Sequence, residues 1–366
     1  MTKTDVFCIK CGSAYPTESV PFRCLICRGL YDFGGVFQFR SEKVDRSQPG
    51  IWRYRHTFGL PPDLEPVSLG EGNTPLIWAR AFGRQIAFKC EFLNPSGSFK
   101  DRGSTVIVAW LKWSGETEAV EDSSGNAGAS FAAYAARAGI KARIFVPTYS
   151  SGPKRRQIEA YGAEVVPIDG SRSAVTDSVL RSAEAGIAYA SHAYLPFNLP
   201  GYATSAYEIV EQLGQMPGAV MVPAGQGGLL LGLARGFDAL RIDKKWNKGP
   251  QMIGVQARAC APLLALFSAE GKKQVSIKNE EFTLAEGVRV SNPLRKEAVL
   301  AAVIASGGSV CVAEENEILP GRDALARLGL YVEPTSAIIW GALSRMVDKL
   351  PDPIVVILTG SGLKYG

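Results

Sequence analysis

The chain of 366 residues has little histidine, no block of like charge and no long apolar run. With only His56 and His192 present, little material exists for a histidine-driven catalytic triad or a histidine metal site. No stretch approaches the ~20 apolar residues of a membrane span, and the first residues lack the apolar run of a signal peptide. We therefore expect a cytoplasmic protein with no membrane partner. The 40 basic and 35 acidic residues are scattered, so the net charge of +5 does not predict a nucleic-acid partner.

Four of the seven cysteines crowd into the first 27 residues, as Cys8-x-x-Cys11 and Cys24-x-x-Cys27. This spacing is typical of a zinc ribbon, in which each pair of thiolates lies on one tight turn. Two such turns complete a tetrahedron around Zn²⁺ and leave no open position for water or substrate, so the predicted role is structural. Four unmetallated cysteines are the alternative.

The length and the distribution of residue types predict several segments. Residues 1–40 form the ribbon-like segment, and residues 41–65 are predicted to be a linker because they are polar, basic and proline-bearing. Further along, short apolar runs such as ARIFVP and IVVILTGSG alternate with helical stretches. This alternation predicts an α/β fold with largely parallel sheets.

A lysine stands in the turn-rich segment NPSGSFKDRG, directly before the apolar and helix-like run TVIVAWLKW. Desolvation and the positive end of the predicted helix both disfavour an ammonium group at Lys100. A lysine that is neutral for part of the time can act as a nucleophile and form a Schiff base. By itself, a lysine in such a place would be interpreted as a solvated surface residue.

Three further segments carry candidate ligand contacts. The sequence Ser123-Ser-Gly-Asn126-Ala-Gly precedes an alanine-rich helix whose first amides could bind a carboxylate, although a simple helix cap is the alternative. The glycine-rich turn Pro223–Leu229 lies between a strand-like and a helix-like run, where its amides could bind a phosphate or merely allow tight packing. Thr359 follows the last predicted strand, where a hydroxyl could contact a ligand in an α/β crevice.

Together and in this order, the motifs SLGEGNTPL, NPSGSFKDRG, SSGNAGAS, EPTSA and LTGSGLK resemble the threonine synthase-like family of fold-type II pyridoxal phosphate enzymes. The resemblance runs from about Val67 to the end of the chain, and some relatives carry a zinc-ribbon-like leader. It implies the two-lobed tryptophan synthase β-like fold, a cytoplasmic enzyme of amino-acid metabolism and a homodimer. The large cofactor-binding domain would comprise residues 66–93 and 206–366, and the small substrate domain residues 94–205.

The resemblance also implies a role for each matching residue. Lys100 would hold pyridoxal phosphate covalently and then serve as the base at the substrate Cα, while Asn126 would hydrogen-bond the ring hydroxyl. Thr359 would face the pyridine nitrogen, and as a neutral group it would favour expulsion of a leaving group. The cofactor phosphate would lie against Gly225, Gln226, Gly227, Gly228 and Leu229. The substrate carboxylate would lie against Ser123, Ser124 and Ala127.

In two places the sequence departs from threonine synthases. Where they carry an Asn-Pro-x-Arg-like segment that grips the phosphate of phosphohomoserine, this chain reads SHAYLPFNLPG, without the arginine. Its Gly-Gln-Gly-Gly-Leu turn also lies closer to the glycine-rich turns of serine and threonine dehydratases. Lys154, Arg155 and Arg156 could supply phosphate contacts instead, or they could be a solvated helix start.

Three functions follow from these observations. The first is a threonine synthase-like lyase, with phosphohomoserine as its first candidate substrate. The second is a dehydratase, ammonia-lyase or β-replacement synthase that acts on a non-phosphorylated amino acid. The third is a non-catalytic binding protein that keeps the fold and uses the ribbon to meet a partner.

Overall fold

The computed structural model describes residues 4–150, 152–270 and 282–365, which divide into two compact units. Unit 1 contains the described residues of 4–72 and 100–201, and unit 2 contains those of 73–99 and 202–365. Both units are therefore built from two separate stretches of the chain. The predicted α/β fold is confirmed, because each unit contains parallel strands that alternate with helices. Among the described residues, no helix combines the length and apolar character that crossing a membrane would require.

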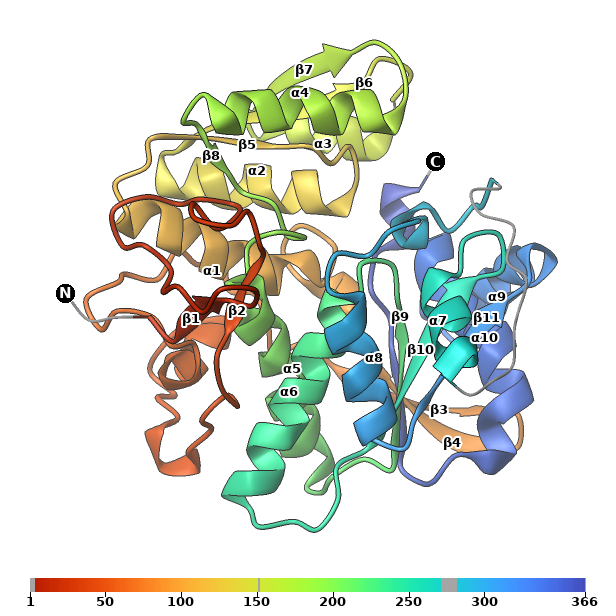
Figure 1. Cartoon of the computed structure of the whole chain (residues 1–366). Coiled ribbons are helices and arrows are strands. Elements are labelled where there is room, and N and C mark those ends of the chain that lie inside the picture. The colour runs from red at the N-terminus through yellow and green to blue at the C-terminus, as the bar shows by residue number, and fades with distance from the viewer. Residues whose placement is uncertain (1–3, 151, 271–281, 366) are drawn as a thin grey trace. The chain divides into compact units, whose positions relative to one another are not determined.

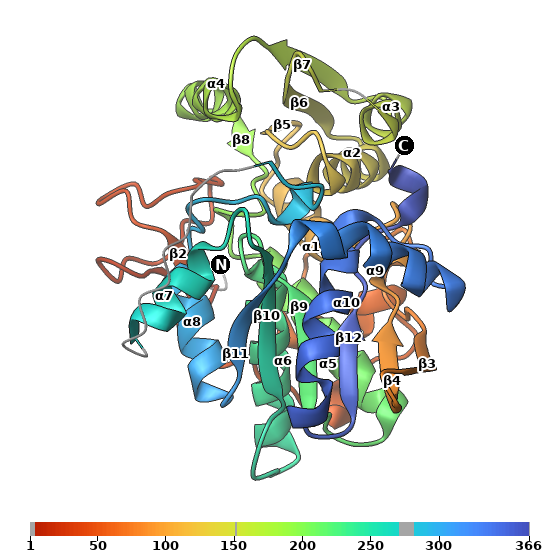
Figure 2. The ribbon, with the colours of Figure 1, turned by 90° about the vertical axis from the view of Figure 1, so that its right-hand side faces the viewer.

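Unit 1 has a four-stranded parallel sheet in the order β7-β6-β5-β8. Its strands are β5 (Glu118–Glu121), β6 (Lys141–Pro147), β7 (Glu164–Ile168) and β8 (Ala188–Tyr189). Its helices are α1 (Lys100–Trp113), α2 (Asn126–Ala138), α3 (Pro153–Ala160) and α4 (Arg172–Glu184). Figure 2 shows α4 on one face of this sheet and α2 and α3 on the other. Most alanines of α2 are buried, and their small size allows α1 to pack closely against this helix.

The N-terminal part of unit 1 is a small antiparallel ribbon followed by two 3-10 helices. Strand β1 (Val6–Cys8) pairs with β2 (Tyr31–Phe33), and η1 (Ser41–Lys43) and η2 (Gly50–Thr57) follow (Figure 1). Residues 41–65 were predicted to be a linker, yet Ile51, Trp52, Tyr54 and Phe58 are fully buried. The prediction rested on the polar, basic and proline-bearing composition of the segment, which gives no sign of these buried apolar residues. The Trp52 indole donates to Thr105 Oγ1 at 2.9 Å, so this segment is attached to α1.

Unit 2 has a six-stranded sheet in the order β11-β10-β9-β12-β4-β3, parallel except for the β3–β4 pair. Its strands are β3 (Leu76–Ala81), β4 (Arg84–Lys89), β9 (Ala219–Pro223), β10 (Gln251–Ala257), β11 (Ser309–Ala313) and β12 (Ile354–Ile357). Its helices are α6 (Gly228–Asp243), α7 (Pro262–Glu270), α8 (Lys296–Ala305), α9 (Glu315–Arg327) and α10 (Pro334–Met346). Short 3-10 turns are η3 (Glu91–Leu93), η4 (Glu286–Val288), η5 (Val347–Lys349) and η6 (Gly362–Lys364). Helix α5 (Asn198–Leu213) begins in unit 1 and continues into unit 2.

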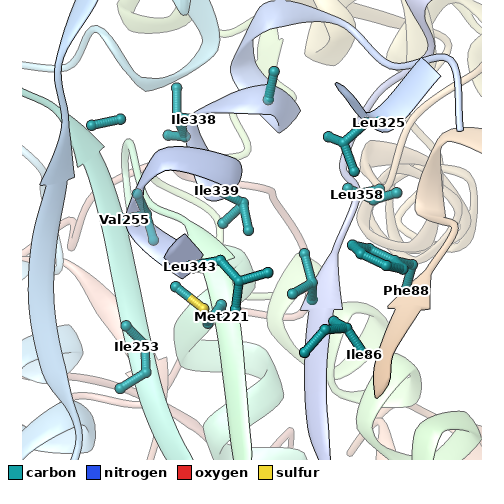
Figure 3. Close-up of a cluster of buried hydrophobic side chains, with 14 of the residues drawn as sticks. Ile86, Phe88, Met221, Ile253, Val255, Leu325, Ile338, Ile339, Leu343 and Leu358 are labelled. Atoms are coloured by element: carbon teal, nitrogen blue, oxygen red, sulfur yellow. The ribbon is translucent and has the colours of Figure 1, made fainter. Parts of the chain in front are cut away.

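The core of unit 2 lies between its sheet and α10. Figure 2 shows α10 in front of β10, β9 and β12, with α5 and α6 behind these strands. Figure 3 shows Ile338, Ile339 and Leu343 of α10 directed toward strand residues such as Met221 and Val255. The apolar side chains of both elements are excluded from water here, and the hydrophobic effect holds the layers together.

A buried ion pair joins β4 to α5 in this unit. Lys89, the last residue of β4, places its Nζ 2.8 Å from Glu208 Oε2 on α5, and both side chains are completely buried. Lys89 Nζ also donates to the Thr74 carbonyl at 2.7 Å and to Gln212 Oε1 at 3.0 Å. Because several hydrogen bonds surround the two charges, their desolvation is compensated.

Candidate functional site

The candidate nucleophile Lys100 is the first residue of α1 and is half-buried. The next two residues, Asp101 and Arg102, are completely buried. Asp101 Oδ1 accepts a hydrogen bond of 2.6 Å from the hydroxyl of Ser130 on α2, which also lies 2.7 Å from Ser104 Oγ. These contacts fix the start of α1 against α2, so the position of Lys100 is set by two packed helices.

The loop Ser123–Gly125 connects β5 to α2 and folds back on the first turn of that helix. Ser123 Oγ accepts a hydrogen bond of 3.2 Å from the Gly125 amide. A Cβ at Gly128 would lie 1.9 Å from the Ser123 carbonyl oxygen, so this position has room only for glycine. Asn126 is the first residue of α2, and no side chain caps the helix at its Gly125 N-cap. The first amides of a 13-residue helix are therefore available to a carboxylate.

Two neighbouring acids at the end of β5 were not predicted as site residues. Asp122 accepts hydrogen bonds from Tyr189 at 2.7 Å, Arg172 at 2.8 Å and Thr176 at 3.1 Å. The signal that could have revealed the site is the sequence Val-Glu-Asp directly before the glycine-containing loop, because ligands in α/β proteins bind at the carboxyl ends of strands.

Glu121 lies in different surroundings from Asp122. It accepts a short hydrogen bond from the Ser123 amide, and its Oε1 lies 3.3 Å from His192 Nδ1. Burial raises the pKa of Glu121 from 4.5 to about 7, although the positive charges of Arg172 and Lys100 oppose this shift. The carboxyl group thus exchanges a proton near neutral pH.

His192 lies in the segment after β8 and was considered in the sequence only as one of two histidines. Burial, followed by the positive charge of Lys100, lowers the pKa of His192 well below its ordinary value, while Asp122 acts in the opposite direction. The imidazole is therefore neutral at physiological pH. The backbone carbonyl of His192 accepts a hydrogen bond from the side-chain amide of Asn198, which is buried at the start of α5.

In unit 2, the glycine-rich turn lies between β9 and α6, as predicted. Gly227 adopts a left-handed conformation with φ of +78°, and a Cβ there would lie 2.6 Å from Val299. Gln226 Oε1 accepts a hydrogen bond of 3.1 Å from the Leu294 amide, so the turn is attached to the segment that precedes α8. Helix α6 begins at Gly228, so its first amides lie at the turn.

Thr359 is buried just after β12, and a serine that was not predicted holds it in place. The hydroxyl of Ser336 on α10 accepts hydrogen bonds from the Thr359 and Gly360 amides at 2.8 and 3.0 Å. The two hydroxyl oxygens of Ser336 and Thr359 are 2.9 Å apart. Strand β12 is a parallel neighbour of β9, so Thr359 and the glycine-rich turn lie at the same edge of the sheet.

The predicted cofactor and substrate residues therefore form two groups, one in each unit. Unit 1 holds Lys100, Ser123, Ser124, Asn126 and Ala127. Unit 2 holds Gly225, Gln226, Gly227, Gly228, Leu229 and Thr359.

The four N-terminal cysteines come together in the ribbon of unit 1. The Sγ atoms of Cys8, Cys11, Cys24 and Cys27 all lie within 4.8 Å of one another. The Cys8–Cys27 and Cys11–Cys24 sulfur pairs are 3.4 and 3.6 Å apart. A tetrahedral zinc ion with Zn–S bonds of about 2.3 Å requires sulfur atoms about 3.8 Å apart, so the cluster can hold a metal ion.

Comparison with known proteins agrees with this arrangement. A family model described as pyridoxal-phosphate dependent enzyme matches residues 67–360. The threonine synthase of Methanocaldococcus jannaschii is 34% identical, with 98% of this chain and 92% of that protein aligned. The threonine synthase of Synechocystis sp. is 35% identical over 86% of this chain and 82% of that protein.

A solved structure, the threonine deaminase of T.th., aligns with a TM-score of 0.66 and 26% identity over 80% of this chain and 94% of that one. The chain belongs to the pyridoxal-phosphate dependent enzymes and, within them, to the threonine synthase-like lyases.

Proposed function

We propose that the protein binds pyridoxal phosphate through Lys100 and catalyses elimination or replacement on a small amino acid. The observation that carries the proposal is in unit 1, where Lys100 starts one helix and the carboxylate-binding loop starts the helix packed against it. The positive charge of Lys100 acts on Glu121 at the end of β5 and on His192 after β8, so the lysine is close to this loop. A nucleophilic amine and a carboxylate site are the two groups that amino-acid chemistry of this type requires.

The residues fit the cofactor. In unit 2, Gly225–Leu229 offer backbone amides at the start of a 16-residue helix, which suits a phosphate. Any Cβ at Gly225 would come within 2.8 Å of the Gly287 carbonyl, so a side chain would disturb the turn. Thr359 offers a neutral hydroxyl for the pyridine nitrogen, and Asn126 offers an amide for the ring hydroxyl. When bound, the cofactor supplies an electron sink for negative charge at the substrate Cα.

The protein's own groups would then perform three tasks. Ser123, Ser124 and Ala127, with the first amides of α2, would bind the substrate carboxylate and so orient the Cα–H bond. Lys100 would remove the Cα proton as a general base. Ser336 would keep Thr359 in place, because its hydroxyl binds both the amide and the side chain of that residue.

Phosphohomoserine is the first candidate substrate, with threonine and phosphate as products, because the relatives reported above are threonine synthases. A second candidate is a dehydratase, ammonia-lyase or β-replacement reaction on a non-phosphorylated amino acid. The observation that favours this second candidate is Asn198, which stands at the end of the segment where threonine synthases carry an arginine. It is buried and bonded to the His192 carbonyl.

The test is a substrate panel of phosphohomoserine, phosphoserine, serine, threonine and O-acetylserine, with release of phosphate and of keto acid followed. Threonine with phosphate supports the first candidate, and keto acid from unphosphorylated substrates supports the second. The Lys100→Ala variant should lose turnover and the visible absorption of lysine-bound cofactor. Lys112→Ala is the matched control, because Lys112 lies near the other end of α1 and is half exposed. Full turnover by the Lys100 variant would disprove the mechanism.

Three further expectations belong to this proposal. The cysteine cluster would hold a structural zinc ion, which the sulfur distances permit. A homodimer and a cytoplasmic location are expected from the family resemblance. Light scattering at several protein concentrations would test the dimer, and fractionation of cells would test the location.

A further inference from the structure

Glu121 and Asp122 are adjacent buried carboxyl groups with unequal sets of partners. Asp122 is saturated by a guanidinium and two hydroxyl groups. Glu121 has the backbone of Ser123 and Asp122 and the Nδ1 of His192 as hydrogen-bond partners, and its side chain is 1% exposed. Burial outweighs the backbone amides and the two cations that favour the carboxylate, so the pKa of Glu121 is raised to about 7.

The histidine bonded to Glu121 completes a chain of proton-carrying atoms. The His192 side chain is 25% exposed, and its Nε2 makes no hydrogen bond to any residue that the structure describes. Because burial and two nearby cations oppose an imidazolium, the proton that the pair holds belongs on Glu121. The Glu121 hydroxyl then donates to Nδ1, which leaves Nε2 as the nitrogen that carries hydrogen. Nε2 is accordingly a hydrogen-bond donor that makes no hydrogen bond within the described part of the chain.

The pair also lies where a substrate would be bound. β5 and β8 are parallel neighbours, so Glu121 at the end of one and His192 after the other lie at the same edge of the sheet. The loop Ser123–Gly125, which would bind the substrate carboxylate, starts two residues after Glu121. The titratable and charged groups that act on the pair are Lys100 of α1, Arg172 of α4, Asp122 beside β5 and Tyr189 of β8.

We propose that Glu121 and His192 form a proton relay that donates a proton to the leaving-group oxygen of the amino-acid substrate. The inference rests on the proposed function. As the carbon–oxygen bond breaks, its electron pair passes to the oxygen, which takes the proton from His192 Nε2. Glu121 replaces that proton through Nδ1 and becomes a carboxylate. Water leaves, solvent returns a proton to Nε2, and Nδ1 gives its proton back to Glu121 before the next cycle.

The relay matters where the leaving group takes up a proton. Hydroxide must depart as water, and a phosphate ester dianion that leaves as HPO4²⁻ also takes up a proton, because the trianion is strongly basic. A chloride ion departs without a proton. General acid catalysis contributes about 10²- to 10⁴-fold where the leaving group requires it. The relay therefore discriminates between substrates by the proton demand of the group that leaves.

The kinetic test compares serine with β-chloroalanine in the holoenzyme and in its Glu121→Gln variant. We expect kcat/KM for serine to fall about 10²-fold or more in the variant, while kcat/KM for β-chloroalanine changes less than about threefold. The wild-type value for serine should decline as the pH rises through about 7, and the variant should lose this dependence. The matched control is Glu118→Gln, which lies on the same strand with its side chain 33% exposed. Equal losses for both substrates would overturn the relay, because they would indicate damage to the site as a whole.

A second measurement does not depend on turnover. The chain has two histidines, so protein labelled with ¹³C at histidine Cε1 gives two signals, and the His56→Gln variant assigns them. We expect the His192 signal to shift with a midpoint near pH 7 as Glu121 titrates, and this shift should vanish in Glu121→Gln. An identical titration in both proteins would overturn the proton-sharing pair.

The failure of the relay can be distinguished from the failure of the proposed function. If phosphohomoserine is turned over and serine is not, the same comparison is made with phosphohomoserine. An unchanged kcat/KM in Glu121→Gln would then overturn the relay while leaving the enzyme class intact. A holoenzyme that turns over no amino acid of the panel would contradict the proposed function and with it the donor role.

Discussion

Replacing Glu121 by glutamine should stabilise the protein, and the gain should grow with pH. The pKa of Glu121 is raised in the folded state from 4.5 to about 7, so ionising this carboxyl costs folding free energy. The wild-type contribution is fully present below about pH 4.5 and is lost as the pH rises through 7. A difference of about 2.5 pKa units corresponds to about 3 kcal/mol, which is the gain expected for the variant at pH 8. At pH 5.5 the same linkage leaves slightly less than half of this gain.

The measurement is urea unfolding of both proteins at pH 5.5 and pH 8, followed by tryptophan fluorescence. Trp52 and Trp110 are completely buried in unit 1, so part of the fluorescence signal reports on the unit that contains Glu121. We expect the stability difference between the two proteins to be about 2 kcal/mol larger at pH 8 than at pH 5.5. Glu118→Gln should show no such increase, because its side chain is partly exposed and its ion pairs are weak. A stability difference that is equal at the two pH values would refute the reasoning, since it would mean that Glu121 is ionised already at pH 5.5.

Two other substitutions test the loop and the ribbon. Gly128→Ala places a Cβ 1.9 Å from the Ser123 carbonyl oxygen, so the loop Ser123–Gly125 must move. We expect KM for the amino-acid substrate to rise at least tenfold. Gly249→Ala is the control and should leave KM unchanged, because Gly249 has open space around it. Cys24→Ser removes a buried thiol of the cysteine cluster and should abolish stoichiometric zinc in metal analysis. It should also lower the melting temperature by about 5 °C or more. Cys311→Ser is the control and should keep the zinc. Full zinc content in the Cys24 variant would contradict the metal site.

Sequence patterns were sufficient for features encoded by consecutive residues. The run of apolar residues before a glycine-rich turn predicted β9 and α6, and the turn before TVIVAWLKW predicted that Lys100 lies at a helix start. The four cysteines were predicted from their spacing and do come together. Local signals of this kind are fixed by backbone geometry over a few residues, which is why they can be recognised in one sequence.

Features that depend on distant residues could not be predicted in this way. Glu121 and His192 are separated by 71 positions, and only the pairing of β5 with β8 brings them together. The burial of Trp52 likewise depends on Thr105 in a helix that comes much later in the chain. Ser336 was recognised as part of the EPTSA motif. Its hydrogen bond from the Thr359 amide, however, depends on how α10 packs beside the end of β12.

The buried pair of Lys89 and Glu208 has a consequence for the evolution of this family. Removing either partner leaves an unpaired charge in the interior at a cost of about 3 to 5 kcal/mol, which is a large part of the stability of an ordinary domain. Replacing both by apolar residues avoids that cost, but a lineage that reaches the double replacement must first pass through a strongly destabilised single one. Relatives should therefore keep both charges or lack both, and the two positions should be inherited together although 119 positions separate them.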